Sequence, residues 1–125
     1  MSSRLPILNV ACNKRNGDLL AQFLGNQGYN SVSVTTIADF ESSLHSVIGF
    51  GLAIVDISGF DRRIWNACDK LSQIHVPLMV VMPMQAQHAR HEGFLHGAQR
   101  VMVKPLIMKE LIESISMVAL ENQHE

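Results

Sequence analysis

Short apolar runs alternate along the chain with segments whose apolar residues recur at helical spacing. The apolar and β-branched runs predict five strands, at residues 6–11, 31–35, 52–57, 78–82 and 100–103. After each run, apolar side chains return every three or four residues, as they do on one face of a helix. The first helix is expected to end at Gly28, and a weaker fourth helix, over residues 86–96, at Gly97. The pattern therefore predicts five strand–helix units.

The remaining helices are indicated by their apolar stripes. Thr36, followed three residues later by Asp39, resembles a capping box, with Asp in place of the usual Glu or Gln. The stripes themselves are Phe40, Leu44, Val47 and Ile48; Ile64, Ala67, Cys68 and Leu71; and Leu111, Ile112, Ile115, Val118 and Ala119.

Strands that are apolar throughout are typical of a parallel sheet covered by helices on both faces. We therefore expect a single α/β domain over residues 1–125, a doubly wound sheet with right-handed crossovers. Ligands of such sheets bind at the carboxyl ends of the strands. Candidate chemistry is therefore expected at residues 11–13, 56–58 and 82–84 and at Lys104.

Composition and charge argue against several classes of function. The chain has 125 residues, 47% of them hydrophobic, and a net charge of -1, which gives no electrostatic case for nucleic acid or a membrane surface. The apolar stretch at residues 76–84 is too short to span a bilayer, and no secretory signal precedes it, so a cytoplasmic protein is expected. The two cysteines, Cys12 and Cys68, are expected to be reduced and buried; a redox-sensing Cys12 is the less favoured alternative.

Asp56 is the one charge in the third apolar run, and Lys104 follows the fifth. A charge at the end of a buried strand is costly unless it is paired or faces a cleft. Lys104 can neutralise Asp56 in a structural ion pair, or it can hold the oxygens of an acyl phosphate formed there. Spacing alone supports both interpretations equally.

Further motifs complete a pattern that resembles the receiver domain of two-component response regulators, the CheY-like family. They are the run from Leu52 to Asp56, the run from Val76 to Val81, Gly97-Ala98, and Val103-Lys104-Pro105-Leu106. The resemblance implies a flavodoxin-like (βα)5 sheet with strand order 2-1-3-4-5. It also implies that the domain is not an enzyme, that Asp56 accepts a phosphoryl group, that Lys104 contacts that group, and that the bond to Pro105 is cis.

The chain departs from this family at the metal site. Receivers bind Mg²⁺ through an acidic pair after the first strand, whereas this chain has Ala11 and Cys12 there. Mg²⁺ prefers oxygen ligands, which a thiol does not supply. Asp56 and the Asn13 amide are weak residual ligands. No metal or other cofactor is therefore expected, or at most weakly bound Mg²⁺.

The switch positions of the family are altered as well. Its Ser or Thr at the end of the fourth strand aligns with Met82, which cannot donate a hydrogen bond to a phosphoryl oxygen. Its aromatic residue three positions before the lysine aligns with Val101, and the loop over residues 57–61 is short. We favour an atypical receiver with impaired or absent phosphorylation at Asp56; a slow, phosphorylation-competent receiver is the alternative.

The resemblance also implies partners. The fourth helix, fifth strand and fifth helix of receivers usually carry dimer or output contacts, and here they span residues 86–120. A histidine kinase or an output protein or domain is the expected partner, and a homodimer can form through the same face. Phe94, Met102, Met108 and Met117 are candidate contact residues. The sequence fits both a stand-alone receiver and the receiver part of a longer regulator.

A flavin- or nucleotide-binding domain is the alternative of another class for this fold. Residues 12–17 would have to form its phosphate loop, but they contain only one glycine and two cations. Three histidines, His88, His91 and His96, are interpreted as facing solvent rather than as metal ligands. Trp65 is expected to serve packing.

Overall fold

The computed structural model describes residues 5–46 and 49–121 and contains one five-stranded sheet. All neighbouring strands are parallel, in the order β2-β1-β3-β4-β5, which confirms the expected topology. The strands are β1 (Ile7–Ala11), β2 (Ser31–Val34), β3 (Leu52–Asp56), β4 (Leu78–Met82) and β5 (Ala98–Val103).

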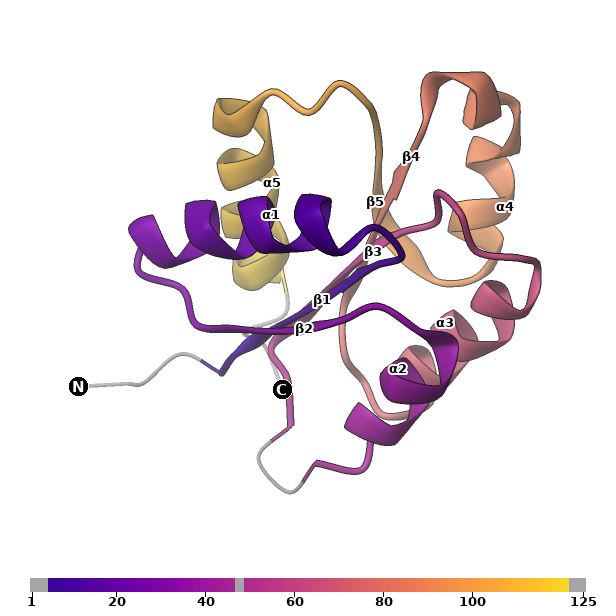
Figure 1. Cartoon of the computed structure of the whole chain (residues 1–125), viewed down its shortest axis with the longest axis horizontal. Helices are drawn as coiled ribbons and strands as arrows, with labels where there is room; N and C mark the ends of the chain where they lie inside the picture. The colour runs from indigo at the N-terminus through magenta and orange to yellow at the C-terminus, as the bar shows by residue number, and fades with distance from the viewer. Residues whose placement is uncertain (1–4, 47–48, 122–125) are drawn as a thin grey trace.

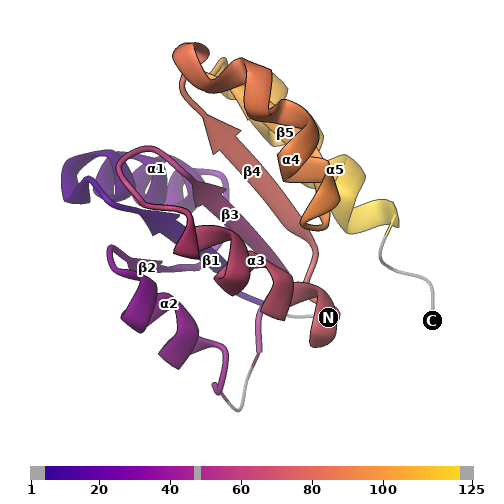
Figure 2. The ribbon, with the colours of Figure 1, turned by 90° about the vertical axis from the view of Figure 1, so that its right-hand side faces the viewer.

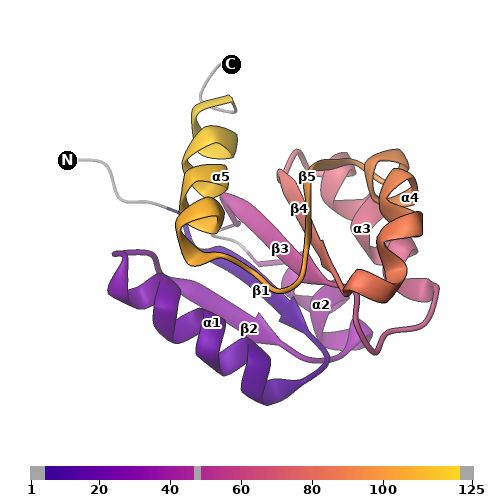
Figure 3. The same ribbon diagram turned by 90° about the horizontal axis from the view of Figure 1, so that it is seen from above.

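Helices cover both faces of this sheet. They are α1 (Lys14–Asn26), α2 (Ile37–Ser43), α3 (Arg63–Gln73), the 3-10 helix η1 (Met84–Ala89), α4 (Arg90–Leu95) and α5 (Met108–Glu121). Figure 1 and Figure 3 show α1 and α5 on one face and α2, α3 and α4 on the other. In Figure 2 the second group lies nearest the viewer, with α5 partly behind α4.

The two faces of the sheet bury separate apolar clusters. Leu8 and Val10 of β1 pack toward α2 and α3, whereas Ile7, which directly precedes Leu8, packs toward α1 and α5. This alternation follows from the strand geometry, in which successive side chains point to opposite faces. The central strands are therefore apolar on both sides, as the continuous runs predicted.

Most helix boundaries follow the sequence signals. The Thr36 hydroxyl accepts a hydrogen bond from the Asp39 backbone N–H at 3.0 Å and caps α2. Gly97 has a φ of +98° after α4, a conformation that glycine adopts without strain. Two boundaries differ from expectation: α2 ends at Ser43, and the fourth helical segment is divided into η1 and α4. Val47 and Ile48, expected on α2, lie outside the described residues.

Candidate functional site

The carboxyl ends of β1, β3, β4 and β5 lie at one edge of the sheet, because all strands are parallel. Ala11 of β1 is the register partner of Asp56 on β3, and Met82 of β4 is the partner of Val103 on β5. Lys104 follows directly after β5. The fold therefore brings together the residues that the sequence singled out.

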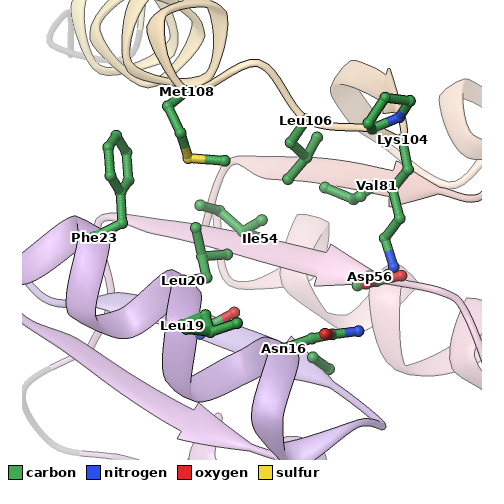
Figure 4. Close-up of a pocket in the computed structure, with 13 residues that line it drawn as sticks. Asn16, Leu19, Leu20, Phe23, Ile54, Asp56, Val81, Lys104, Leu106 and Met108 are labelled. Carbon is green, nitrogen blue, oxygen red and sulfur yellow. Dashed lines mark ion pairs between the residues drawn. The ribbon is translucent and has the colours of Figure 1, made fainter.

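Asp56 and Lys104 form an ion pair at this edge. Lys104 Nζ lies 2.6 Å from Asp56 Oδ2, and the two side chains are 30% and 15% exposed, respectively. Figure 4 shows the lysine side chain reaching down from β5 to the carboxylate. The peptide bond between Lys104 and Pro105 is cis, as expected.

Ser58 completes the environment of the pair. Its backbone N–H donates to Asp56 Oδ1 at 3.0 Å, and Lys104 Nζ donates to its hydroxyl at 3.4 Å. Both carboxylate oxygens of Asp56 therefore have a partner. The sequence placed Ser58 at the edge but gave no sign that it would contact both members of the pair.

The positions of the family's acidic pair offer no second carboxylate. Ala11 is 5% exposed and belongs to the core. Cys12 is exposed, which corrects the expectation of a buried thiol. The reason is that β1 ends at Ala11, so that Cys12 already belongs to the turn into α1 and lies against Gly59.

The Asn13 side-chain oxygen, expected as a weak residual ligand for Mg²⁺, forms a hydrogen bond at the start of α1. Asn13 is the N-cap of α1, and its Oδ1 accepts a hydrogen bond from the Asn16 backbone N–H at 3.0 Å. Within residues 5–46 and 49–121, no three His, Cys, Asp or Glu side chains gather closely enough to hold a metal ion. A magnesium site that needs several oxygen ligands therefore does not fit these residues.

The two switch positions are core residues. Met82 is fully buried and Val101 is 8% exposed, both in the apolar cluster beneath α2 and α3. Val101 packs so closely on α4 that a Cβ atom added to Gly93 would lie 3.1 Å from it. Neither side chain carries a group that can donate a hydrogen bond to a phosphoryl oxygen.

The histidines divide into two classes. His88 and His91 are exposed, as expected. His96 is not simply solvent-facing: its ring stacks on Trp65 at a centroid distance of 5.1 Å, and its Nδ1 lies 2.7 Å from Asp69 Oδ1. Trp65 is buried, so that its expected packing role is confirmed, with His96 as part of its environment.

Asn9 is a buried polar residue that belongs to none of the sequence motifs above. It is 1% exposed and sits inside β1, and its Nδ2 donates to the Gly17 carbonyl at 2.9 Å and to Ser33 Oγ at 3.3 Å. The available signal was a single amide side chain within the apolar run at residues 6–11. Such a residue is unusual on a strand that is buried on both faces.

The phosphate loop required by the flavin alternative is occupied by the start of α1. Lys14 is already the first residue of the helix and forms an ion pair with Asp18 at 2.8 Å. Gly17 is buried, and its backbone N–H donates to the Asn13 carbonyl at 3.1 Å. These contacts give the flavin alternative no support.

Comparison with solved structures identifies the fold. A CheY-like receiver domain protein from Methanospirillum hungatei superposes with a TM-score of 0.86 at 21% identity, over 97% of this chain and 98% of that chain. The receiver domain of a putative LuxO repressor protein from Vibrio parahaemolyticus gives 0.83 at 17% identity, over 97% and 94%. NtrX from Brucella abortus gives 0.85 at 17% identity, over 97% of this chain and 28% of that chain.

Sequence comparison adds no relative. No protein-family model matches the chain, and no curated protein matches it. At these identities the likeness shows the fold, which is the flavodoxin-like fold of response-regulator receiver domains. In the described ranges, no helix is both long enough and apolar enough to cross a membrane.

Proposed function

Since the chain has the receiver fold, we propose that it is a receiver-like signalling domain that acts through protein–protein contacts, with Mg²⁺-dependent phosphorylation impaired or absent. One observation carries this proposal. Asp56 is already neutralised by Lys104 at 2.6 Å, while its register partner on β1 is the apolar Ala11. The pair is thus complete without a metal ion.

Phosphoryl transfer depends on positioning and on neutralisation of the charge that develops on the transferred group. A bound metal ion supplies much of that neutralisation in such sites. Here the positions of the acidic pair and the switch hydroxyl hold Ala11, Cys12 and Met82. Lys104 is the remaining cation beside Asp56, and it supports the alternative of slow phosphorylation without a well-formed metal site.

The face formed by α4, β5 and α5 is the proposed contact surface. Phe94, Met108 and Met117 are 45%, 38% and 49% exposed, although side chains of this size are more often buried. Met102 is partly buried against the α5 side of the core. A histidine kinase, an output protein or domain, or a second copy of the chain is the proposed partner on this surface.

Magnesium titration tests the lost metal site. The wild-type protein is expected to show no saturable change in calorimetry or in Trp65 fluorescence at millimolar Mg²⁺. The variant Ala11→Asp/Cys12→Asp places two carboxylates beside Asp56 and is expected to gain saturable binding. Binding by the wild type as tight as by this variant would contradict the proposal.

The contact surface is tested with matched charge insertions. Met117→Glu on α5 is expected to weaken self-association or binding of a cognate kinase by about tenfold or more, because it introduces an unpaired charge into an apolar contact. Ile74→Glu, at a residue that is 46% exposed at the end of α3, is the control. Equal effects of the two substitutions would argue against this surface.

A further inference from the structure

A pocket opens between α1 and the segment that leads from β5 into α5 (Figure 4). Its volume is about 350 Å³, within the range of small-molecule sites in proteins. Its walls are mainly apolar and come from α1, from the sheet and from the start of α5. The larger apolar side chains among them are Leu19, Leu20, Phe23, Ile54, Leu106 and Met108.

Polar groups gather at the sheet side and at one end of this pocket. Asn9, Asn16, Asp56 and Lys104 all line it. Figure 4 shows Asp56 and Lys104 together at one end and the apolar side chains of Leu20, Phe23 and Met108 away from them. An apolar cavity with a few convergent polar groups is the usual composition of a small-ligand site.

Asn9 supplies the most specific of these groups. Its amide nitrogen donates toward α1 and toward Ser33 on β2, so that both of its N–H groups are used. The amide oxygen of the same group is the atom left to accept a further hydrogen bond. No donor among the described residues contacts this oxygen, although the residue is 1% exposed.

The described residues contain no fully enclosed side-chain oxygen or nitrogen without a hydrogen-bond partner. The Asn9 oxygen therefore opens into the pocket that the residue lines. A buried acceptor that faces an apolar cavity requires a donor from water or from a ligand. This requirement defines one feature of the ligand: a hydrogen-bond donor at the sheet side of the pocket.

The charge at the end of the pocket defines a second feature. Asp56 and Lys104 neutralise each other at 2.6 Å, so that this end has no net charge. An anionic or cationic ligand would lose its hydration against apolar walls without a free counter-ion. A neutral ligand does not meet this cost.

We propose that this pocket binds a small neutral aromatic molecule that carries one N–H or O–H donor, with the donor directed at Asn9 and the ring packed between Phe23 and Ile54. The pocket shares Met108 with the α4–β5–α5 contact surface, but its other apolar residues come mainly from α1 and from the sheet. Asp56 and Lys104 form one end of the pocket, so that a ligand bound there lies beside the ion pair at the edge of the sheet.

Indole tests this proposal, with benzofuran as its matched analogue without a donor. Two-dimensional amide NMR spectra of the full chain are recorded during titration with each compound at millimolar concentrations. Indole is expected to give saturable shifts confined to α1, β1 and the residues after Lys104. Benzofuran, which has an oxygen in place of the N–H, is expected to bind about tenfold more weakly, because it leaves the acceptor unpaired.

A pocket-filling variant and its control locate the binding. Leu19, at the mouth of the pocket, is 55% exposed, and Leu95 on α4 is 69% exposed and lies outside it. Leu19→Trp is expected to weaken indole binding by about tenfold or more, while Leu95→Trp leaves it unchanged. Both positions are exposed, so that folding is retained.

Three results would overturn the inference. One is the absence of saturable shifts with indole, which would mean that the pocket holds water. Another is equal affinity for indole and benzofuran, which would show that the ligand does not donate a hydrogen bond to Asn9. The last is equal loss of affinity in the two tryptophan variants, which would show that indole binds elsewhere on the surface.

Discussion

At the edge where the parallel strands end, two sets of residues differ in chemical character. We call the ends of β3 and β5 the charged half and the ends of β1 and β4 the apolar half, although the strands alternate in the sheet. The ends of β3 and β5 provide a charged pair, Asp56 and Lys104, with both side chains less than one-third exposed. The ends of β1 and β4 provide Ala11 and Met82, both buried in the core. The charged half is held together by the ion pair itself and by the contacts of Ser58 with both of its members.

This difference shows that an aspartate and a lysine at these positions are insufficient evidence of phosphorylation. An ion pair is costly to break once it is withdrawn from water, whatever its function. Ala11 and Met82 beside the pair add to the core packing and carry no oxygen ligand for a metal ion. The two halves therefore make different contributions to stability, which substitutions can separate.

The largest effect is expected from the apolar half. Met82→Ala removes a fully buried side chain from the cluster beneath α2 and α3, and it should lower the free energy of unfolding by about 2–5 kcal/mol. Urea denaturation measures this loss. Met84→Ala, at a residue that is 57% exposed, is the control and should change stability by no more than about 0.5 kcal/mol. Similar losses in both variants would mean that the β4 end is not part of the core.

A smaller effect is expected from the charged half. Lys104→Met leaves the Asp56 carboxylate without its cation and should cost about 1–3 kcal/mol, below the loss for a fully buried pair because both groups keep some exposure. In an Asp56→Asn background the same substitution should cost less. The double-mutant cycle measures the difference as a coupling free energy.

The exposed pair of Lys14 and Asp18 is the matched control for this cycle. These side chains are 80% and 59% exposed and lie one helical turn apart on α1. Their coupling should not exceed about 0.5 kcal/mol. A coupling at Asp56 and Lys104 as small as this one would contradict a standing ion pair.

Cys68 shows what burial does to an acidic group in the apolar core. Burial raises the pKa of its thiol from the ordinary value of 9.0 to about 12. Above pH 9 the unfolded chain releases this proton while the folded protein retains it, so stability falls as pH rises. The expected slope between pH 9 and the folded pKa is about 1.4 kcal/mol per pH unit.

Urea denaturation at several alkaline pH values measures this slope, with Cys68→Ala as the comparison. The variant starts from lower stability because it leaves a small cavity, but its decline should lack the contribution of the thiol. Parallel declines for the two proteins would show that the folded protein does not hold Cys68 as a thiol. Near pH 9, where the thiol of the unfolded chain begins to titrate, this change in stability is smaller than the losses expected for Met82→Ala and Lys104→Met.

The sheet was predictable from the chain because its strands are continuous apolar runs and its turns carry clear signals, such as Thr36 before α2 and Gly97 after α4. The pair of Asp56 and Lys104 was predictable because parallel strands bring their carboxyl ends to one edge. Its partnership with Ser58 was not, since that contact depends on the path of a short loop.

Other features depend on tertiary contacts that no local pattern reports. The stacking of His96 on Trp65 joins α4 to α3, and sequence spacing alone suggested a solvent-facing histidine. Cys12 was expected to be buried beside the end of the first strand, but it is exposed in the turn that follows Ala11. Asn9 was hidden in an apolar run, and its importance appears only once the pocket beside β1 is known.

Labelling by a small acyl phosphate donor tests the central claim most directly. The protein is incubated with the donor and millimolar Mg²⁺, and intact mass is measured beside an Asp56→Ala control. We expect little or no added phosphoryl mass in the wild type, equal to that in the control. Stoichiometric labelling that depends on both Asp56 and Mg²⁺ would contradict it and establish a working receiver.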